Sequence, residues 1–227
     1  MLCQESPMLS RAGWLALFLS FSLPSAVRAD DVEEREFSVL IDGKDAGLSR
    51  MKLIQKDDGV TYMSGNVDIK FKHLFVVDYI LKIDTQEWWK DGKLIGLKTA
   101  AVENGKKTDV TIAADASQLR MRVNGQERML KSEMWTTSFW RLADAKFHNK
   151  HVGIIEVDTG KEFNSELKYI GKEKLKVSGD FHECYHFRVS AAPTPVDLWF
   201  DKYHRLVRQE FTESGHKTVV QLMKVTR

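Results

Sequence analysis

The sequence contains few of the residues that mark specialised protein classes. Its 227 residues include two cysteines and four prolines, and 34 basic residues nearly balance 32 acidic ones. Two cysteines cannot form a disulfide scaffold or a four-cysteine metal site. A formal charge of +2 is no signature of nucleic-acid binding, so we expect no nucleic-acid partner. With 43% hydrophobic residues, the chain is typical of a folded globular protein.

Familiar catalytic fingerprints are also absent. The sequence has no G-x-S-x-G, no H-E-x-x-H, no glycine-rich phosphate loop and no pair of C-x-x-C motifs. A site assembled from distant residues would leave no such motif. We therefore expect a protein that is not an enzyme and needs no cofactor.

The first 29 residues have the pattern of a secretory signal peptide. Arg11 precedes an apolar run of about ten residues, and small residues then lead to Ala29. A membrane-spanning helix needs about twenty apolar residues. We expect residues 1–29 to be removed, and the remainder to be exported to the periplasm or beyond the cell and not to be an integral membrane protein. Cys184 is then the one remaining cysteine, so no internal disulfide can form.

Residues 30–227 read as one antiparallel β domain. Turn-forming dipeptides such as Asp91-Gly92 and Asn124-Gly125 punctuate the chain. Between them, apolar and polar residues alternate, as in Phe37, Val39 and Ile41, which indicates strands with one buried face. This pattern predicts a mainly β fold: a single curved antiparallel meander of about ten or eleven strands, forming a half-open or closed barrel.

The segment at residues 132–146 departs from this alternation. The spacing of Trp135, Phe139 and Trp140 favours one short helix. We expect this helix to plug the concave face of the sheet, either as ordinary core or as a lid over a ligand.

A second unusual segment is the run from Phe181 to Phe187. If it is a strand, His182, Cys184 and His186 project from the same face. Imidazole and thiolate groups suit zinc or copper, so these three residues are candidate metal ligands. The outer residues of such a set lie about 13 Å apart on a flat strand, so a neighbouring strand would have to supply further ligands. The alternative is a polar hairpin face with Cys184 packed as a small apolar residue.

The last third of the chain resembles the closing meander of uncharacterised exported bacterial proteins that are classed as domains of unknown function. The residues that carry this resemblance are Leu198, Trp199, Phe200, Asp201, Arg205, Leu206, Val207, Arg208 and Gly215. More distantly, the order of elements resembles periplasmic lipoprotein carriers and the sensor domain of an envelope-stress regulator. This resemblance implies a half-open barrel around an apolar cavity, and it implies no catalytic residue.

These observations lead to a hypothesis and two alternatives. The leading hypothesis is an exported protein that binds a lipid or another hydrophobic ligand in its concave face. The first alternative is a structural or protein-interaction module of the cell envelope, with a packed interior and no ligand cavity; the second is the metal site. Candidate ligand-lining residues are those expected to face inward, namely Phe71, Leu81, Met121, Trp135, Phe139, Trp140, Tyr185, Phe187 and Leu198.

Overall fold

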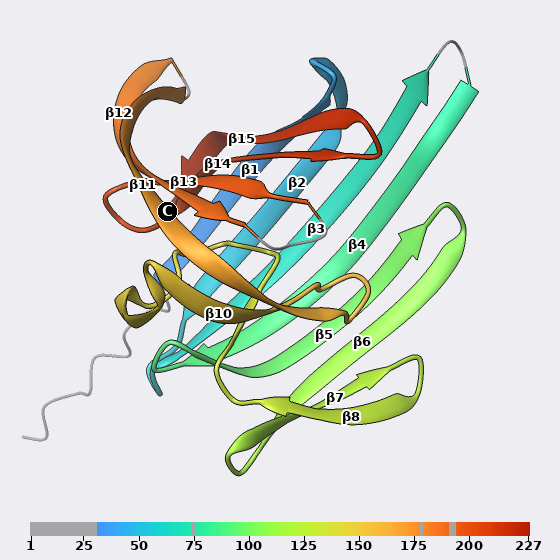
Figure 1. The fold of residues 1–227 in the computed structure, drawn as a ribbon, viewed down its shortest axis with the longest axis vertical. Helices are drawn as coiled ribbons and strands as arrows, with labels where there is room; N and C mark the ends of the chain where they lie inside the picture. Colours follow the sequence, from blue (N-terminus) through green and yellow to red (C-terminus); the bar gives the residue numbers. More distant parts are fainter. Residues whose placement is uncertain (1–30, 74–75, 178, 191–193) are drawn as a thin grey trace, which may run out of the picture.

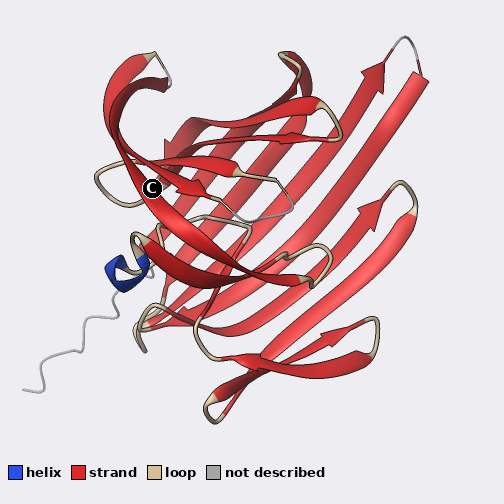
Figure 2. Cartoon of the chain, in the orientation of Figure 1, coloured by secondary structure: helices blue, strands red, loops and turns tan. Residues whose placement is uncertain are grey.

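The fold is built almost entirely from β-strands (Figures 1 and 2). The computed structural model describes residues 31–73, 76–177, 179–190 and 194–227, so the predicted signal peptide lies outside the described residues. The described part contains fifteen strands and one short 3-10 turn, η1 (Ala145–Phe147). The first eight strands are β1 (Asp31–Ile41), β2 (Lys44–Gln55), β3 (Val60–His73), β4 (Val76–Lys90), β5 (Lys93–Glu103), β6 (Lys106–Asp115), β7 (Gln118–Val123) and β8 (Gln126–Lys131). The others are β9 (Met134–Thr136), β10 (Lys150–Ile155), β11 (Glu162–Val177), β12 (Asp180–Val189), β13 (Val196–Phe200), β14 (Leu206–Glu213) and β15 (His216–Thr226).

All fifteen strands belong to one sheet. Its order is β8-β7-β6-β5-β4-β3-β2-β1-β15-β14-β13-β12-β11-β10-β9, so the first and last strands pair near its centre. Neighbours are antiparallel except β9 and β10, which are parallel. The strands β8 and β9 follow each other in sequence but form opposite edges of the sheet, and β9 returns into contact with β5. The sheet therefore curls into a nearly closed barrel, which confirms the predicted β meander.

Several predicted hairpin turns are confirmed by their backbone angles. The φ angles are 49° and 74° at Asp91 and Gly92, and 48° and 86° at Asn124 and Gly125. Two consecutive positive φ angles twist a hairpin in the same sense as its strands, and Asp-Gly and Asn-Gly adopt them most readily. These turns keep most strand connections short, so sequence neighbours become sheet neighbours.

The predicted helix at residues 132–146 is wrong. Residues Met134–Thr136 form β9, which pairs with β10, and Phe139 has a φ of 45° that no right-handed helix allows. Only η1 is helical in this part of the chain, and Figure 2 shows it as the sole helical element drawn. The partner that makes β9 a strand lies some twenty residues later, so local spacing could not reveal it. The expected ten or eleven strands were also too few, since fifteen are present in the described part.

The interior divides into two unequal parts. Figure 1 shows β2–β6 as a broad wall, with β10–β13 crossing in front of it. A large buried cluster between them is rich in aromatic side chains, including Trp89, Trp135, Phe139 and Phe200. A smaller cluster on β1–β5 contains mostly aliphatic residues, together with Phe71. One part of the barrel is thus filled by aromatic rings, whereas the other has a thinner lining.

Candidate ligand pocket

Two adjoining cavities lie on the inner face of the barrel, beside the smaller cluster. The deeper cavity has a volume of about 210 Å³ and the outer one about 450 Å³. Both are lined by Ile69 and Asp158, so they adjoin each other, and we call the two together the pocket. The outer cavity alone falls within the range of small-molecule sites, roughly 300–1,000 Å³. The apolar side chains around it are Ile41, Ile69, Phe71, Leu81 and Phe211.

Small residues on the inner face of the sheet leave room for the deeper cavity. Ser49, Gly65 and Thr85 line it from β2, β3 and β4. A Cβ atom at Gly65 would come within 3.0 Å of the Thr85 Cγ2 atom, so any larger residue would have to displace that side chain. The Thr85 and Thr99 hydroxyls lie 2.8 Å apart and hydrogen-bond to each other. Small, mutually satisfied side chains therefore leave space that longer ones would fill.

The floor of the pocket comes from the segment that follows β9. Thr137 and Ser138 line the deeper cavity, and Val157 from the β10–β11 turn lies beside them. Immediately beyond them, the Phe139 and Trp135 rings meet edge to face with centroids 4.7 Å apart. Residues 134–140, which we call the plug, thus fill the barrel interior as expected of the predicted helix, but they do so as the short strand β9 followed by a turn.

A buried carboxylate anchors this plug to the opposite wall. Glu87 on β4 is fully buried, and its Oε2 atom accepts hydrogen bonds from Trp89 Nε1 (2.7 Å), Thr136 Oγ1 (3.1 Å) and Trp140 Nε1 (3.3 Å). Among the described side chains, Glu87 Oε1 is the buried polar atom that lacks a partner. Burial raises the pKa of Glu87 above its ordinary value, although the hydrogen bonds from Trp89, Ser138, Thr136 and Trp140 oppose the shift.

A second anchor lies on β1. Arg35 is buried, its Nη1 donates to the Trp140 carbonyl oxygen, and its Nε donates to Glu33 at 2.7 Å. Glu33 in turn accepts from Arg227 Nε at 2.7 Å, which ties the last residue of the chain to the first strand. Burial lowers the pKa of Arg35, and the hydrogen bond and charge of Glu33 oppose this. At the end of the barrel where β1 begins, Glu33 is therefore paired with both Arg35 and Arg227.

The predicted ligand-lining residues separate into two groups. Phe71 and Leu81 line the outer cavity. The other seven do not border either part of the pocket: most are buried in the aromatic cluster, and Tyr185 is half-buried against it. These seven are Met121, Trp135, Phe139, Trp140, Tyr185, Phe187 and Leu198. Alternation identifies the inward face of a strand but not which end of the barrel is filled.

Several lining residues were not among those candidates. Tyr79, Glu103, Asp158 and Glu213 all border the outer cavity. Polar residues near strand ends are usually solvated, so nothing in their local sequence pointed to a pocket. Their positions near strand ends or, for Asp158, in the β10–β11 turn were the one available signal.

The three candidate metal ligands occupy different environments. His182 is exposed, whereas Cys184 and His186 are buried. Burial raises the pKa of the Cys184 thiol to about 11, and the negative charges of Asp201, Glu173 and Glu183 add to this shift. Within the described ranges, no group of three or more His, Cys, Asp or Glu side chains is arranged to hold a metal ion.

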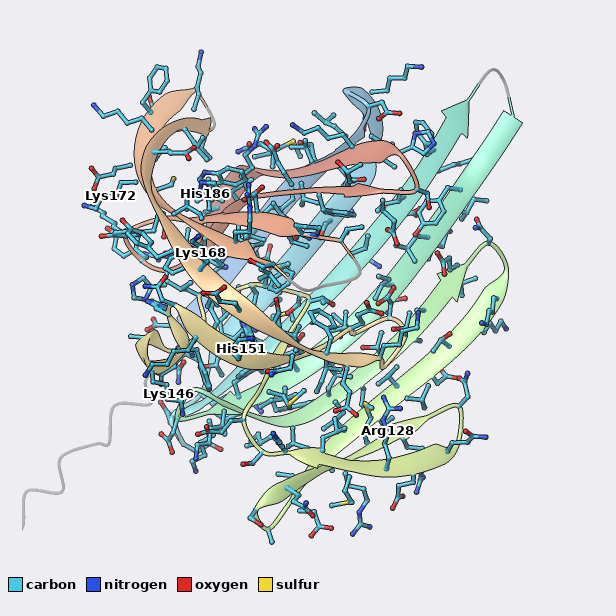
Figure 3. The ribbon with its side chains drawn as sticks, in the orientation of Figure 1. Arg128, Lys146, His151, Lys168, Lys172 and His186 are labelled. Carbon is cyan, nitrogen blue, oxygen red and sulfur yellow. The ribbon has the colours of Figure 1, made fainter. Side chains whose placement is uncertain are left out.

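His186 is instead held by carboxylates on neighbouring strands. Its Nδ1 lies 2.8 Å from Glu173 Oε1 and its Nε2 lies 2.7 Å from Asp197 Oδ1. Its ring stacks on Trp199, with centroids 4.3 Å apart. Figure 3 labels His186 on β12 and Lys168 and Lys172 on the adjacent β11. Both ring nitrogens are engaged, so neither offers a free lone pair to a metal.

The Leu-Trp-aromatic-Asp motif has a structural role at the β13–β14 turn. Asp201 Oδ1 accepts hydrogen bonds from the backbone nitrogens of Tyr203 (2.8 Å) and Arg205 (3.0 Å). Asp201 Oδ2 accepts from Arg205 Nε at 2.7 Å. Asp201 of the motif and Arg205 therefore close one turn.

Comparisons with known proteins agree with the fold. A crystal structure titled as a beta-barrel-like protein of domain of unknown function DUF1849, from Brucella abortus, is similar to this chain with a TM-score of 0.62. The match covers 86% of this chain and 97% of the other at 6% sequence identity, so it shows a shared fold. No curated protein matches in sequence. None of the helices among the described residues has the length and apolar character required to cross a membrane.

The sequence resemblance to proteins of unknown function is confirmed by a family model. The model of DUF6134, a domain of unknown function, matches residues 37–223, from the middle of β1 to near the end of β15. That range contains the pocket, the plug and the Glu87 anchor, whereas Glu33, Arg35 and Arg227 of the second anchor lie outside it. The chain belongs to the DUF6134 family.

Proposed function

We propose that this protein is a non-enzymatic binding protein that holds a lipid or another hydrophobic ligand in the pocket on its concave face. The observation that carries the proposal is the pair of adjoining cavities, of which the outer one alone has a volume of about 450 Å³. A purely structural module would gain stability by filling this space, because protein interiors are normally close-packed. The aromatic plug fills the other part of the barrel, and the pocket does not extend into it.

The chemistry of the walls favours an aliphatic or aromatic ligand. Val39, Val67, Ile83 and Val220 surround the deeper cavity, where they present methyl groups. Burying one CH₂ group contributes about 0.8 kcal/mol, so a chain of six such groups would contribute about 5 kcal/mol. Part of this is offset by the loss of translational and rotational freedom on association. Apolar burial of this size supports reversible binding.

We also propose that the protein acts outside the cytoplasm. The proposal rests on the signal-peptide pattern of residues 1–29. It is consistent with a mature chain that folds without a disulfide, because Cys184 is buried and unpaired.

A pair of adjacent substitutions tests the pocket. Val220 lines the deeper cavity, whereas its neighbour Val219 projects from the opposite face of β15. In V220W the indole fills the cavity, so we expect the affinity for the neutral probe N-phenyl-1-naphthylamine to fall at least tenfold. The matched control, V219W, should bind within twofold of the wild type. The measurement is a fluorescence titration of each purified protein.

Circular dichroism and thermal unfolding establish that both variants are folded before they are compared. Equal affinity of V220W and the wild type would place the probe elsewhere and contradict the proposal. Failure of the wild-type protein to bind the probe would also contradict it.

A further inference from the structure

The mouth of the pocket combines apolar walls with carboxylates from three separate elements. Glu103 lies at the end of β5, Asp158 in the β10–β11 turn and Glu213 at the end of β14. All three border the same outer cavity as Phe71 and Ile69. Residues distant in sequence thus bring negative charge to one opening, directly beside an apolar surface.

These carboxylates lack the basic partners found elsewhere in the molecule. At the opposite end of the barrel, Asp201 is paired with Arg205 at 2.6 Å and Glu33 with Arg35 at 2.7 Å. By contrast, none of Glu103, Asp158 and Glu213 forms an ion pair with a residue in the described ranges.

Two basic residues of the described chain, Lys106 and His216, lie beside carboxylates of the mouth but form no ion pair with them. Lys106 lies opposite Glu103 in the β5–β6 ladder, but the ion pairs of the described residues include none between them. His216 borders the pocket, but its Nδ1 atom lies 2.7 Å from Asp42 Oδ2 and is therefore already engaged. The mouth consequently has an excess of negative charge among its described lining residues.

The electrostatic effect of this arrangement is visible on neighbouring groups. Burial raises the pKa of Tyr79, and the charges of Glu103, Glu213 and Asp158 all add to the shift. The Tyr79 hydroxyl donates a hydrogen bond to Glu103. Burial likewise raises the pKa of Asp158, and repulsion from Glu156 and Glu103 contributes. The three carboxylates therefore act on the same small region, which a positive charge would stabilise.

We propose, building on the proposed function, that the ligand is an amphipathic cation with an apolar chain in the pocket and an ammonium group among Glu103, Asp158 and Glu213. Phe71 and Tyr79 provide aromatic faces near the same opening, and aromatic rings attract ammonium groups. Charge complementarity distinguishes this ligand from a fatty acid, whose carboxylate would be repelled. The structure thus favours a long-chain amine or quaternary ammonium compound over a neutral or anionic lipid.

Three probes with the same ten-carbon chain test this inference: decyltrimethylammonium, decanol and decanoate. Each is titrated below its aggregation concentration as a competitor of N-phenyl-1-naphthylamine on the full chain. We expect the ammonium probe to bind at least tenfold more tightly than decanol, and decanoate to bind most weakly. Because the chain is constant, the difference reports the head group alone.

Charge-removing substitutions locate the effect. The triple variant E103Q/D158N/E213Q should bind decyltrimethylammonium and decanol within threefold of each other, while its affinity for decanol remains that of the wild type. A control with the same change in net charge, E36Q/D57N/D180N, alters carboxylates away from the pocket and should keep the full preference for the cation.

The outcomes separate the two proposals. If all three probes bind the wild type equally, the proposed function stands and the cation preference is wrong. If decanoate binds best, or if the control loses the preference as the triple variant does, the cation proposal is likewise overturned. If none of the probes displaces the dye, both proposals fail.

Discussion

Replacing Glu87 by alanine should lower the free energy of unfolding by about 3–5 kcal/mol. The substitution leaves two tryptophan N–H groups and the Thr136 hydroxyl without their shared acceptor inside the core. It also opens a void between β4 and the plug. Urea-induced unfolding followed by tryptophan fluorescence measures the effect. The neighbouring Q86A variant changes an exposed side chain of the same strand and should remain within about 0.5 kcal/mol of the wild type.

The E87Q variant tests the charge state of the same group. The pKa of Glu87 is raised in the folded protein, whereas in the unfolded chain it keeps its ordinary value of 4.5. Above pH 4.5 the unfolded chain therefore releases a proton that the folded protein retains. The stability of the wild type relative to E87Q should fall as the pH rises from 4.5, until the folded pKa is passed.

Two results would contradict this account of Glu87. One is an E87A variant within 1 kcal/mol of the wild type. The other is a wild type that gains stability relative to E87Q as the pH rises above 4.5, because that direction requires a lowered pKa in the folded protein.

Replacing Arg35 by alanine should lower the free energy of unfolding by about 3 kcal/mol. The buried side chain donates to the Trp140 carbonyl oxygen and to Glu33, and its removal leaves a cavity beneath the plug. R35M retains most of the volume but none of the donors, so it should recover only part of the loss. R50A, which changes an exposed arginine on the neighbouring β2, is the matched control. Full recovery of stability in R35M would show that packing, and not the hydrogen bonds, anchors the plug.

The sequence predicted the parts of the fold that depend on local periodicity. Alternation along Phe37, Val39 and Ile41 follows from the period of two of a strand, and all three residues are buried. The Asp-Gly and Asn-Gly turns follow from the few residues that accept positive φ. Neither signal depends on a distant partner, which explains why both were readable from the sequence.

The failures involve long-range pairing. Trp135 and Phe139 have helix-like spacing, but β9 forms because β10 offers a parallel edge and because Glu87 accepts hydrogen bonds from Thr136 and Trp140. Similarly, His182, Cys184 and His186 share a strand, but Glu173 and Asp197 occupy both nitrogens of His186. The partners in each case come from other strands, and a single sequence does not contain that information.

We expected a ligand pocket on the concave face, and only part of the expected lining borders the two cavities. Phe71 and Leu81 were expected to line it and do so. The carboxylates Glu103, Asp158 and Glu213 were missed, because each lies at a strand end or in a turn, where charged residues are common. Only the curling of the sheet brings the three to one opening.

Photoaffinity labelling tests the central claim, that the concave pocket binds a hydrophobic ligand, most directly. A neutral alkyl diazirine is irradiated with the full chain, and the labelled residues are identified by peptide mass spectrometry. The pocket predicts labels in the peptides that contain Ile41, Ile69 and Phe211, and their suppression by excess decanol. Labels confined to exposed aromatic residues such as Phe181 and Tyr203, and insensitive to decanol, would contradict the claim.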